Sequence, residues 1–258
     1  MATPNYTRSQ GLGRATAAEI DAGLRAYMNK VYALMGGAMI ITALVAYVVG
    51  MDFKALTNGQ PTALIPESAL VAMFSSPIRW VIMFAPLAVV FFFSFRIHKM
   101  SAETAQMVFW GFAALMGLSI AWIFAVFTGI SIAQTFLATA AGFGAMSLYG
   151  YTTQKDLSGW GRFLFMGVIG LIVASLLNIF FFESSALSFA ISLLGVLIFA
   201  GLTAYDTQNI KNTYLELRGT PEGEAVLEKG AVMGALSLYL NFLNMFMFLL
   251  QFMGMSEE

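Results

Sequence analysis

One carboxylate stands out among the residues that could do chemistry in this chain. No charged residue occurs from Ser184 to Tyr205, and Asp206 follows directly at the end of that apolar stretch. An acid at the edge of a hydrocarbon-length helix is costly unless it has a hydrogen-bond partner, an ion-pair partner or water, so such an acid usually marks a functional site. Asp206 is therefore our first candidate for a functional residue.

The composition decides the class of protein that surrounds this acid. The chain has 258 residues, of which 59% are hydrophobic and only 10% are charged, and its mean hydropathy is +0.78. The net charge of -1 gives no argument for binding nucleic acid. The chain has no cysteine and one histidine, His98, which excludes disulfides, thiolate chemistry and a cysteine- or histidine-rich metal site. These values predict an all-α membrane protein that crosses the bilayer several times.

The number of membrane spans follows from where charged residues stop. A helix needs about 20 apolar residues to cross the hydrocarbon layer. The stretch between Glu103 and Lys155 has no charge and is too long for one span, and the segment TGIS at 128–131 divides it in two. We therefore predict seven transmembrane helices. Their expected ranges are 27–49, 80–95, two helices between 103 and 155, 163–182, 186–205 and 231–253.

The basic residues predict the orientation and the domain boundaries. With the N-terminus in the cytoplasm, Lys54 and Arg79 are the only lysines and arginines that fall outside, which agrees with the positive-inside rule. We expect a polar cytoplasmic tail at residues 1–25, a transmembrane domain at 26–254 and a short C-terminal tail at 255–258. The acidic segment 212–228, which contains glycine and proline, is expected to be a solvated cytoplasmic loop.

Polar residues recur at helical spacing on the last two predicted helices. Steps of three and four residues place such residues on one face of a helix, and amides and hydroxyls in apolar surroundings need hydrogen-bond partners. The two stripes should therefore face the interior of the bundle and each other, either as contacts that hold the helices together or as the lining of a water-filled pathway. The stripe of the sixth helix contains Ser188, Ser192, Gly195, Phe199 and Thr203, and that of the seventh contains Ser237, Asn241, Asn244 and Gln251.

Other polar residues near these helices have two interpretations each. Arg96 lies at the inner end of the second predicted helix, where it could pair with Asp206 or extend to the interface as a membrane anchor. We expect His98 to be an interfacial residue and Asn178 to form a hydrogen bond between helices.

Three segments resemble the Bax inhibitor-1 family, which is also called the transmembrane BAX inhibitor motif family. Within it, their pattern resembles the bacterial YccA-type. They are SLYGYTTQKDLSGWG at 147–161, GLTAYDTQNIK at 201–211 and GALSLYLNFLNMFMFLLQFMG at 234–254. The resemblance implies seven helices with the last one central, and a calcium leak across the membrane. In channel-like members an acid on the sixth helix pairs with an acid on the seventh, and an arginine of the second can engage them. Asp206 matches the first acid, and is thereby a candidate Ca²⁺ contact, and Arg96 matches the arginine.

The sequence departs from the family at the second acid, whose position holds Asn241. Two close carboxylates cannot both ionise easily, so they share a proton and act as a pH switch. An amide can instead donate a hydrogen bond to an ionised Asp206. One acid is also a weaker attraction for Ca²⁺, which prefers several oxygen ligands. The resemblance implies a calcium leak, and the substitution predicts that its pH switch is altered.

Two functions follow from these observations. The first is passive cation permeation, with Ca²⁺ as the permeant ion, gated near Asp206 in a bacterial inner membrane. The second is a membrane-embedded modulator of a membrane-bound protease or another complex, as described for some bacterial relatives. We expect no enzyme activity and no cofactor, because the membrane portion has one acid and no base or cysteine beside it.

Overall fold

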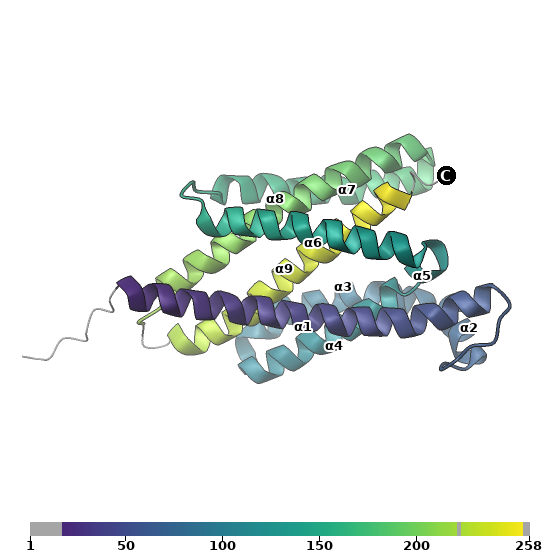
Figure 1. Cartoon of the computed structure of the whole chain (residues 1–258), viewed down its shortest axis with the longest axis horizontal. Coiled ribbons are helices and arrows are strands. Elements are labelled where there is room, and N and C mark those ends of the chain that lie inside the picture. Colours follow the sequence, from purple (N-terminus) through teal and green to yellow (C-terminus); the bar gives the residue numbers. More distant parts are fainter. Residues whose placement is uncertain (1–16, 221–222, 255–258) are drawn as a thin grey trace, which may run out of the picture.

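The computed structural model describes residues 17–220 and 223–254, and within them the chain is helical, without strands. The predicted all-α class is therefore confirmed. Figure 1 shows the helices as a long bundle whose members run roughly along one axis. The elements are α1 (Ala17–Thr57), α2 (Glu67–Ser75), α3 (Ile78–Arg96), the 3-10 turn η1 (Ile97–Lys99), α4 (Ala102–Ile120), α5 (Ile123–Val126), α6 (Gly129–Thr152), α7 (Ser158–Leu177), the π-helical turn η2 (Asn178–Phe182), α8 (Ser185–Leu217) and α9 (Gly223–Gly254).

Among the residues that the structure describes, six helices are long and apolar enough to span a membrane, and α2 and α3 add a seventh span if together they make one crossing. These two helices are bent by 68° at their junction. The bend follows from Pro77, which forces the preceding Ser76 into an extended conformation, with φ -98° and ψ 172°. The chain is therefore a multi-pass membrane protein with six or seven spans.

Several helices extend beyond the stretches that hydropathy marks, and the prediction of a loop at 212–228 is wrong. Helix α1 already begins at Ala17, so residues 17–25 of the tail expected at 1–25 are helical, and the expected domain boundaries stay predictions. The loop predicted at 212–228 is mostly helix, because only 218–222 lies between α8 and α9. Contacts beyond the apolar stretch stabilise these extensions: Tyr27 stacks on Tyr214 at 5.1 Å between ring centroids. Residues 1–16 of the predicted tail and all of 255–258 lie outside the described residues.

The predicted break within residues 103–155 is confirmed. Helix α5 ends at Val126 and α6 begins at Gly129. The Thr128 hydroxyl caps α6 by accepting a hydrogen bond from the Ser131 backbone N–H across 3.1 Å. The cap satisfies a backbone donor at the start of a helix that has no polar solvent along most of its length.

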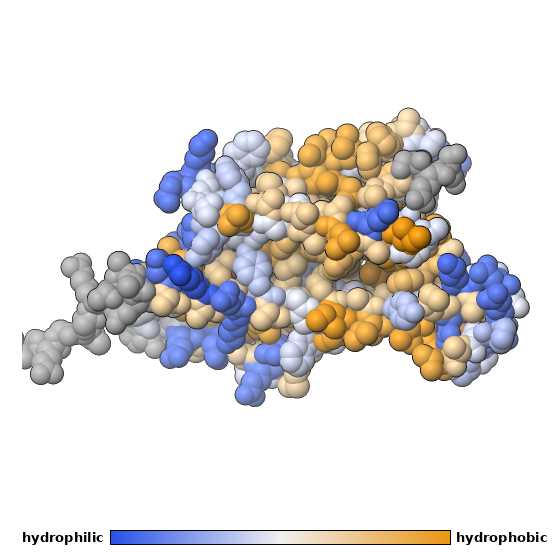
Figure 2. All heavy atoms as spheres, in the orientation of Figure 1, coloured by the Kyte–Doolittle hydropathy of each residue, from blue (hydrophilic) through white to orange (hydrophobic). Residues whose placement is uncertain are grey.

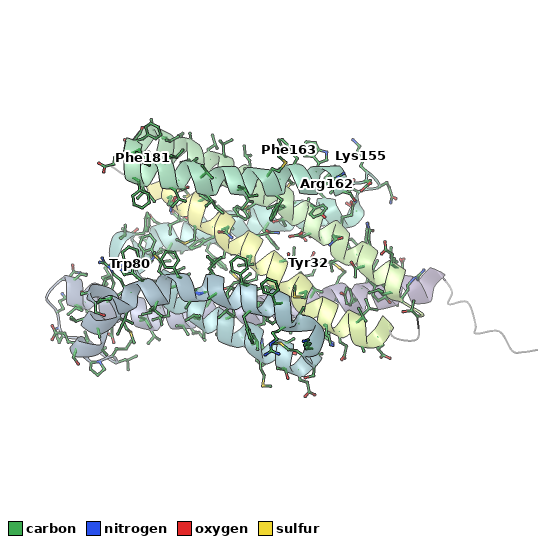
Figure 3. The ribbon with its side chains drawn as sticks, turned by 180° about the vertical axis from the view of Figure 1, so that it is seen from behind. Tyr32, Trp80, Lys155, Arg162, Phe163 and Phe181 are labelled. Atoms are coloured by element: carbon green, nitrogen blue, oxygen red, sulfur yellow. The ribbon has the colours of Figure 1, made fainter. Side chains whose placement is uncertain are left out.

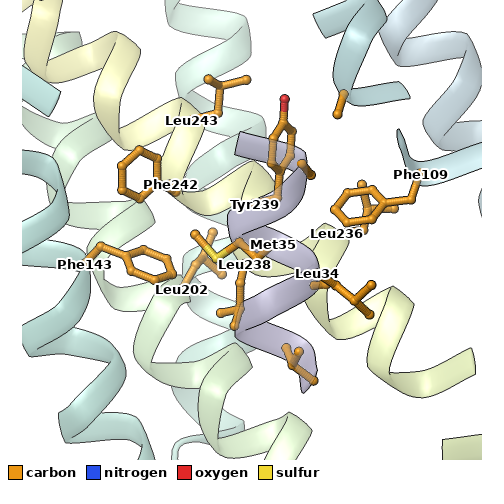
Figure 4. Close-up of a cluster of buried hydrophobic side chains, with 14 of the residues drawn as sticks. Leu34, Met35, Phe109, Phe143, Leu202, Leu236, Leu238, Tyr239, Phe242 and Leu243 are labelled. Atoms are coloured by element: carbon orange, nitrogen blue, oxygen red, sulfur yellow. The ribbon is translucent and has the colours of Figure 1, made fainter. Parts of the chain in front are cut away.

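Helix α9 is the most buried of the spans. In its most apolar window 61% of the residues are buried, against 17% to 39% in the other spans. It packs against α8, α1, α6 and α4, and in Figure 1 it crosses diagonally between the other helices. Figure 4 shows its side chains Leu238, Tyr239, Phe242 and Leu243 among residues of α1, α4 and α6. The central position of the last helix agrees with what the family resemblance implies.

The two ends of the bundle differ from its middle. Figure 2 shows hydrophilic residues at both ends and hydrophobic residues over much of the middle. In Figure 3, Lys155 and Arg162 lie at one end, whereas Trp80 and Phe181 lie toward the other. The end that holds Lys155 and Arg162 is the one predicted to face the cytoplasm, and we call it the basic end. The orientation across the bilayer stays a prediction.

Candidate functional site

The candidate site centres on one hydrogen bond between α8 and α9, the two helices with the most extensive contact. The Asn241 amide Nδ2 on α9 donates to Oδ2 of Asp206 on α8 across 2.6 Å. The Ser237 side chain, one turn earlier on α9, is a second hydrogen-bond partner of this carboxyl group. Asn241 is buried and Asp206 is half-buried. Two uncharged side chains therefore hold the acid at the helix interface.

Small residues bring the two helices close enough for this contact. A Cβ at Gly195 would lie 2.5 Å from the Phe248 ring, and a Cβ at Gly234 would lie 2.9 Å from the Ile210 side chain. A larger residue at either position would require the neighbouring side chain to shift. Helices in membranes approach closely where glycine removes such side-chain atoms. The two glycines flank the Asp206–Asn241 contact along the interface and set the distance that its hydrogen bond needs.

Arg96 does not join this pair. Its side chain is exposed, and its guanidinium carbon lies 6.0 Å from the centroid of the Phe92 ring, one turn earlier on α3. Within the described part of the chain Asp206 has no ion-pair partner. The Arg96 side chain therefore extends along its own helix. Its pairing with Asp206 stays a prediction. The side chain of His98 lies outside the described ones.

The predicted polar stripes of α8 and α9 face each other. Besides the Asp206–Asn241 contact, the buried Ser192 hydroxyl on α8 donates to Gln251 Oε1 on α9 across 3.4 Å. Thr203 is fully buried, but its hydroxyl donates back to the Phe199 carbonyl of its own helix across 2.8 Å. Thr203 therefore serves its own helix and makes no polar link to α9.

Two neighbouring cavities carry polar side chains along the same interface. One, of about 880 Å³, is lined by Asn178, Ser188, Ser192, Asn244 and Gln251 among others, at the end of the bundle opposite to the basic end. The other, of about 510 Å³, is lined by Ser175, Ser237, Asn241, Asn244 and a set of apolar residues. Asn244 and Phe248 line both cavities. The two cavities thus extend from the outer end of the bundle to the partner of Asp206.

Asn178 closes the junction between η2 and α8, as expected for a hydrogen bond between helices. Its Nδ2 donates to the Ser188 hydroxyl across 2.7 Å and to the Ser184 carbonyl across 3.2 Å, and its Oδ1 accepts from the Ser184 N–H across 2.9 Å. Asn178 also lines the outer cavity, so it combines a packing role with a polar wall.

Comparison with known families decides which fold family this arrangement belongs to. The family described as "Inhibitor of apoptosis-promoting Bax1" matches residues 24–258, nearly the whole chain. The chain belongs to the Bax inhibitor-1 family. The match includes all of the segments that carry Asp206, Asn241 and Arg96.

Bacterial relatives of this Bax inhibitor-1 family member cover nearly its full length. An uncharacterized protein of Caulobacter vibrioides is 42% identical over 98% of this chain and 97% of its own. An uncharacterized protein of Rickettsia prowazekii is 43% identical over 91% of each chain. The inner membrane protein YbhL of Escherichia coli is 42% identical over 90% of this chain and 93% of its own. The spans and this relative place the chain in the bacterial inner membrane.

Two buried polar clusters of this family member escaped the sequence analysis. On α6, Ser147 hydrogen-bonds Tyr32 of α1 and, across 3.1 Å, Thr207 of α8. At the centre of the bundle, the Thr42 and Tyr239 hydroxyls lie 2.7 Å apart. Each cluster joins helices that are far apart in sequence, so helical spacing within one segment cannot reveal which residues meet. The only signal was a hydroxyl on an otherwise apolar face.

Proposed function

We propose that this chain is a passive cation leak, with Ca²⁺ as the permeant ion and a gate at the Asp206–Asn241 contact. The observation that carries the proposal is the line of polar side chains that leads from the outer end of the bundle to this contact through two cavities. A pathway for ions through an apolar bundle needs such a lining, because an ion in contact with hydrocarbon has no replacement for its water shell.

The lining supplies the ligands that a hard cation prefers. Calcium binds carboxylate, amide and hydroxyl oxygens, and it keeps part of its water shell in weak sites. Asn178, Ser192, Asn244 and Gln251 in the cavity walls offer neutral oxygens, and Asp206, bound to the wall residue Asn241, offers a negative charge next to the lining. A single acid favours brief contact over tight binding, which suits an ion that must leave again.

The same contact supports a closed resting arrangement. The Asn241 amide and the Ser237 side chain both engage the Asp206 carboxyl group, which draws α8 and α9 together at this level. Phe248, stacked on Phe199 at 5.9 Å between centroids, lies at the wall that both cavities share. Permeation then requires the carboxylate to exchange its amide partner for a cation and its water.

The test is calcium flux into proteoliposomes that contain the full-length protein, compared with Asp206→Asn. We expect the wild type to admit calcium above empty liposomes and the variant to reduce flux several-fold, because it removes the negative charge at the proposed gate. Glu216→Gln is the matched control, since it neutralises an exposed acid on the same helix. It should leave the flux unchanged.

Two outcomes would contradict the proposal, the first by rejecting the leak and the second by rejecting the gate at Asp206. Flux no higher than in empty liposomes would favour a modulator of a membrane protease or another complex, and an equal loss in both variants would mean that Asp206 has no special role. Deletion of residues 1–16 separates the functions further. A leak through α8 and α9 should survive this deletion, whereas a regulator that binds its partner through the polar N-terminal segment should not.

A further inference from the structure

A groove between α1 and α6 near the basic end of the bundle is not used by the proposed leak. It has a volume of about 780 Å³ and is lined by Asp21, Arg25, Tyr32, Phe143 and Gly144 among others. Helices α1 and α6 run side by side in Figure 1, yet α1 packs mainly against α4 and α9, α6 packs mainly against α8 and α9, and the contact between α1 and α6 is only slight. The groove is therefore a lateral opening toward the space that lipids occupy around a membrane protein.

The walls of this groove change in polarity along its length. Tyr32 of α1 and Ser147 of α6 meet in a hydrogen bond across it and fix the register of the two helices. Arg25 lies about two turns from Tyr32 toward the basic end, whereas Phe143 lies about one turn from Ser147 toward the middle of the bundle. At 1.5 Å per residue, the groove spans about 16 Å between these ends. One end is charged and the other is apolar, which is the pattern of an amphiphile.

The charged end carries one charge of each sign. The Arg25 Nη2 and Asp21 Oδ2 atoms are 3.9 Å apart, and the side chains are 73% and 69% exposed, so the pair is loose and open to solvent. An arginine is the preferred partner of a phosphate, and a carboxylate accepts hydrogen bonds from an ammonium group. A headgroup that has both a phosphate and a primary ammonium would satisfy the two residues at once.

We propose that this groove binds a phospholipid with a phosphoethanolamine headgroup. The phosphate contacts Arg25, the ammonium contacts Asp21, and one acyl chain lies along the apolar wall formed by Phe143, Gly144 and Leu148. A headgroup with a net negative charge fits less well, because Asp21 would repel it. A choline headgroup fits less well too, because its quaternary ammonium has no N–H to donate.

Native mass spectrometry of the delipidated full-length protein tests this proposal. The probes are phosphatidylethanolamine, phosphatidylcholine and phosphatidylglycerol with identical acyl chains. We expect one tightly bound phosphatidylethanolamine, with an affinity at least about tenfold higher than that of the other two lipids, which corresponds to about 1.4 kcal/mol. Equal binding of the three lipids would overturn the assignment of the headgroup.

Two glycines on α6 give a matched pair of variants for the groove itself. A Cβ added at Gly144 or at Gly142 would meet no atom within 4 Å, but only Gly144 lines the groove. Gly144→Trp should fill the groove and lower the affinity for phosphatidylethanolamine at least tenfold, while Gly142→Trp should bind as the wild type does. Equal binding by both variants would place the lipid elsewhere.

Two exposed substitutions test the headgroup without risk to the fold. Asp21→Asn should remove the preference for ethanolamine over choline, and Arg25→Gln should weaken all three lipids. A preference that survives Asp21→Asn would overturn the proposed ammonium contact. Lipid binding that occurs only after deletion of residues 1–16 would show that this segment, and not a lipid, occupies the groove.

Discussion

Asn241 donates a hydrogen bond to Asp206 across 2.6 Å, at the position where the family resemblance implies a second acid in channel-like members. The acid thereby has a neutral partner on the central helix of the bundle. An amide has no proton to share with a carboxylate over the physiological pH range, so the contact has lost the coupled titration that a pair of acids would have. This difference can be reversed by one substitution.

Asn241→Asp should make calcium flux depend on pH between about 5 and 8, the range in which a proton-sharing pair of acids can be tuned. At low pH the two carboxyl groups share one proton, and the contact between α8 and α9 stays closed. At high pH both carboxylates are ionised, and their repulsion separates α8 from α9. Flux should therefore rise with pH. Proteoliposomes at several pH values measure it, and a profile no steeper than that of the wild type would contradict the prediction.

Tyr239→Phe should destabilise the bundle by about 1 kcal/mol, since it removes a hydroxyl whose oxygen lies 2.7 Å from that of Thr42. The ring would remain in place, because Phe109 and Phe112 contact it edge-on, each at 5.8 Å between centroids. Thermal unfolding in detergent is the measurement. Tyr149→Phe, which alters a half-exposed tyrosine on the surface of α6, is the control, and an equal shift in both variants would refute a special role for the buried hydroxyl.

Gly150→Ala should be strongly destabilising, by about 1–3 kcal/mol or more, because the added methyl group would lie 2.2 Å from the Ala204 carbonyl oxygen. A backbone atom cannot move aside as a flexible side chain can, so α6 would have to shift away from α8. Gly142→Ala on the same helix meets open space and should be neutral or slightly stabilising. Unfolding midpoints of the two variants compare them directly, and similar values would contradict the close approach.

Asp52→Ala should release the connection between α1 and α2. The Asp52 carboxylate accepts hydrogen bonds from the N–H groups of Ala63, Leu64 and Ile65 at 2.8, 2.8 and 2.6 Å. Without these acceptors, the three amides should exchange with solvent markedly faster, by about tenfold or more. Hydrogen exchange measures this effect, and Glu216→Gln should leave the amides protected. Unchanged exchange in Asp52→Ala would mean that another group holds the segment.

The sequence analysis predicted the features that depend on composition and on spacing within one helix. The apolar stretches, the break at Thr128 and the facing stripes of α8 and α9 follow from such local patterns. The ends of the helices were harder to predict from the sequence, because polar residues can continue a helix when another helix packs against them. Tyr214 lies in a segment predicted as a loop, yet it is helical and stacks on Tyr27 of α1.

The parts of the site that could not be predicted depend on how distant helices meet. The contact of Tyr32 with Ser147 joins α1 to α6, and nothing in either segment specifies the other as its partner. For Arg96 the sequence position suggested an ion pair with Asp206. In the structure α3 packs on α4, and the Arg96 guanidinium lies over Phe92 of its own helix instead.

The lengths of α8 and α9 have a mechanical consequence. With 33 and 32 residues they are each nearly 50 Å long, whereas the hydrocarbon layer is about 30 Å thick. The C-terminal end of α8 and the N-terminal end of α9, joined by the connection 218–222, thus form a stiff helical extension of the span that carries Asp206. Asp206 is 11 residues from the end of α8, about 16 Å along the axis. A lateral force on this extension would be transmitted by both helices to the level of the Asn241–Asp206 hydrogen bond. A displacement of about 1 Å is enough to break that bond.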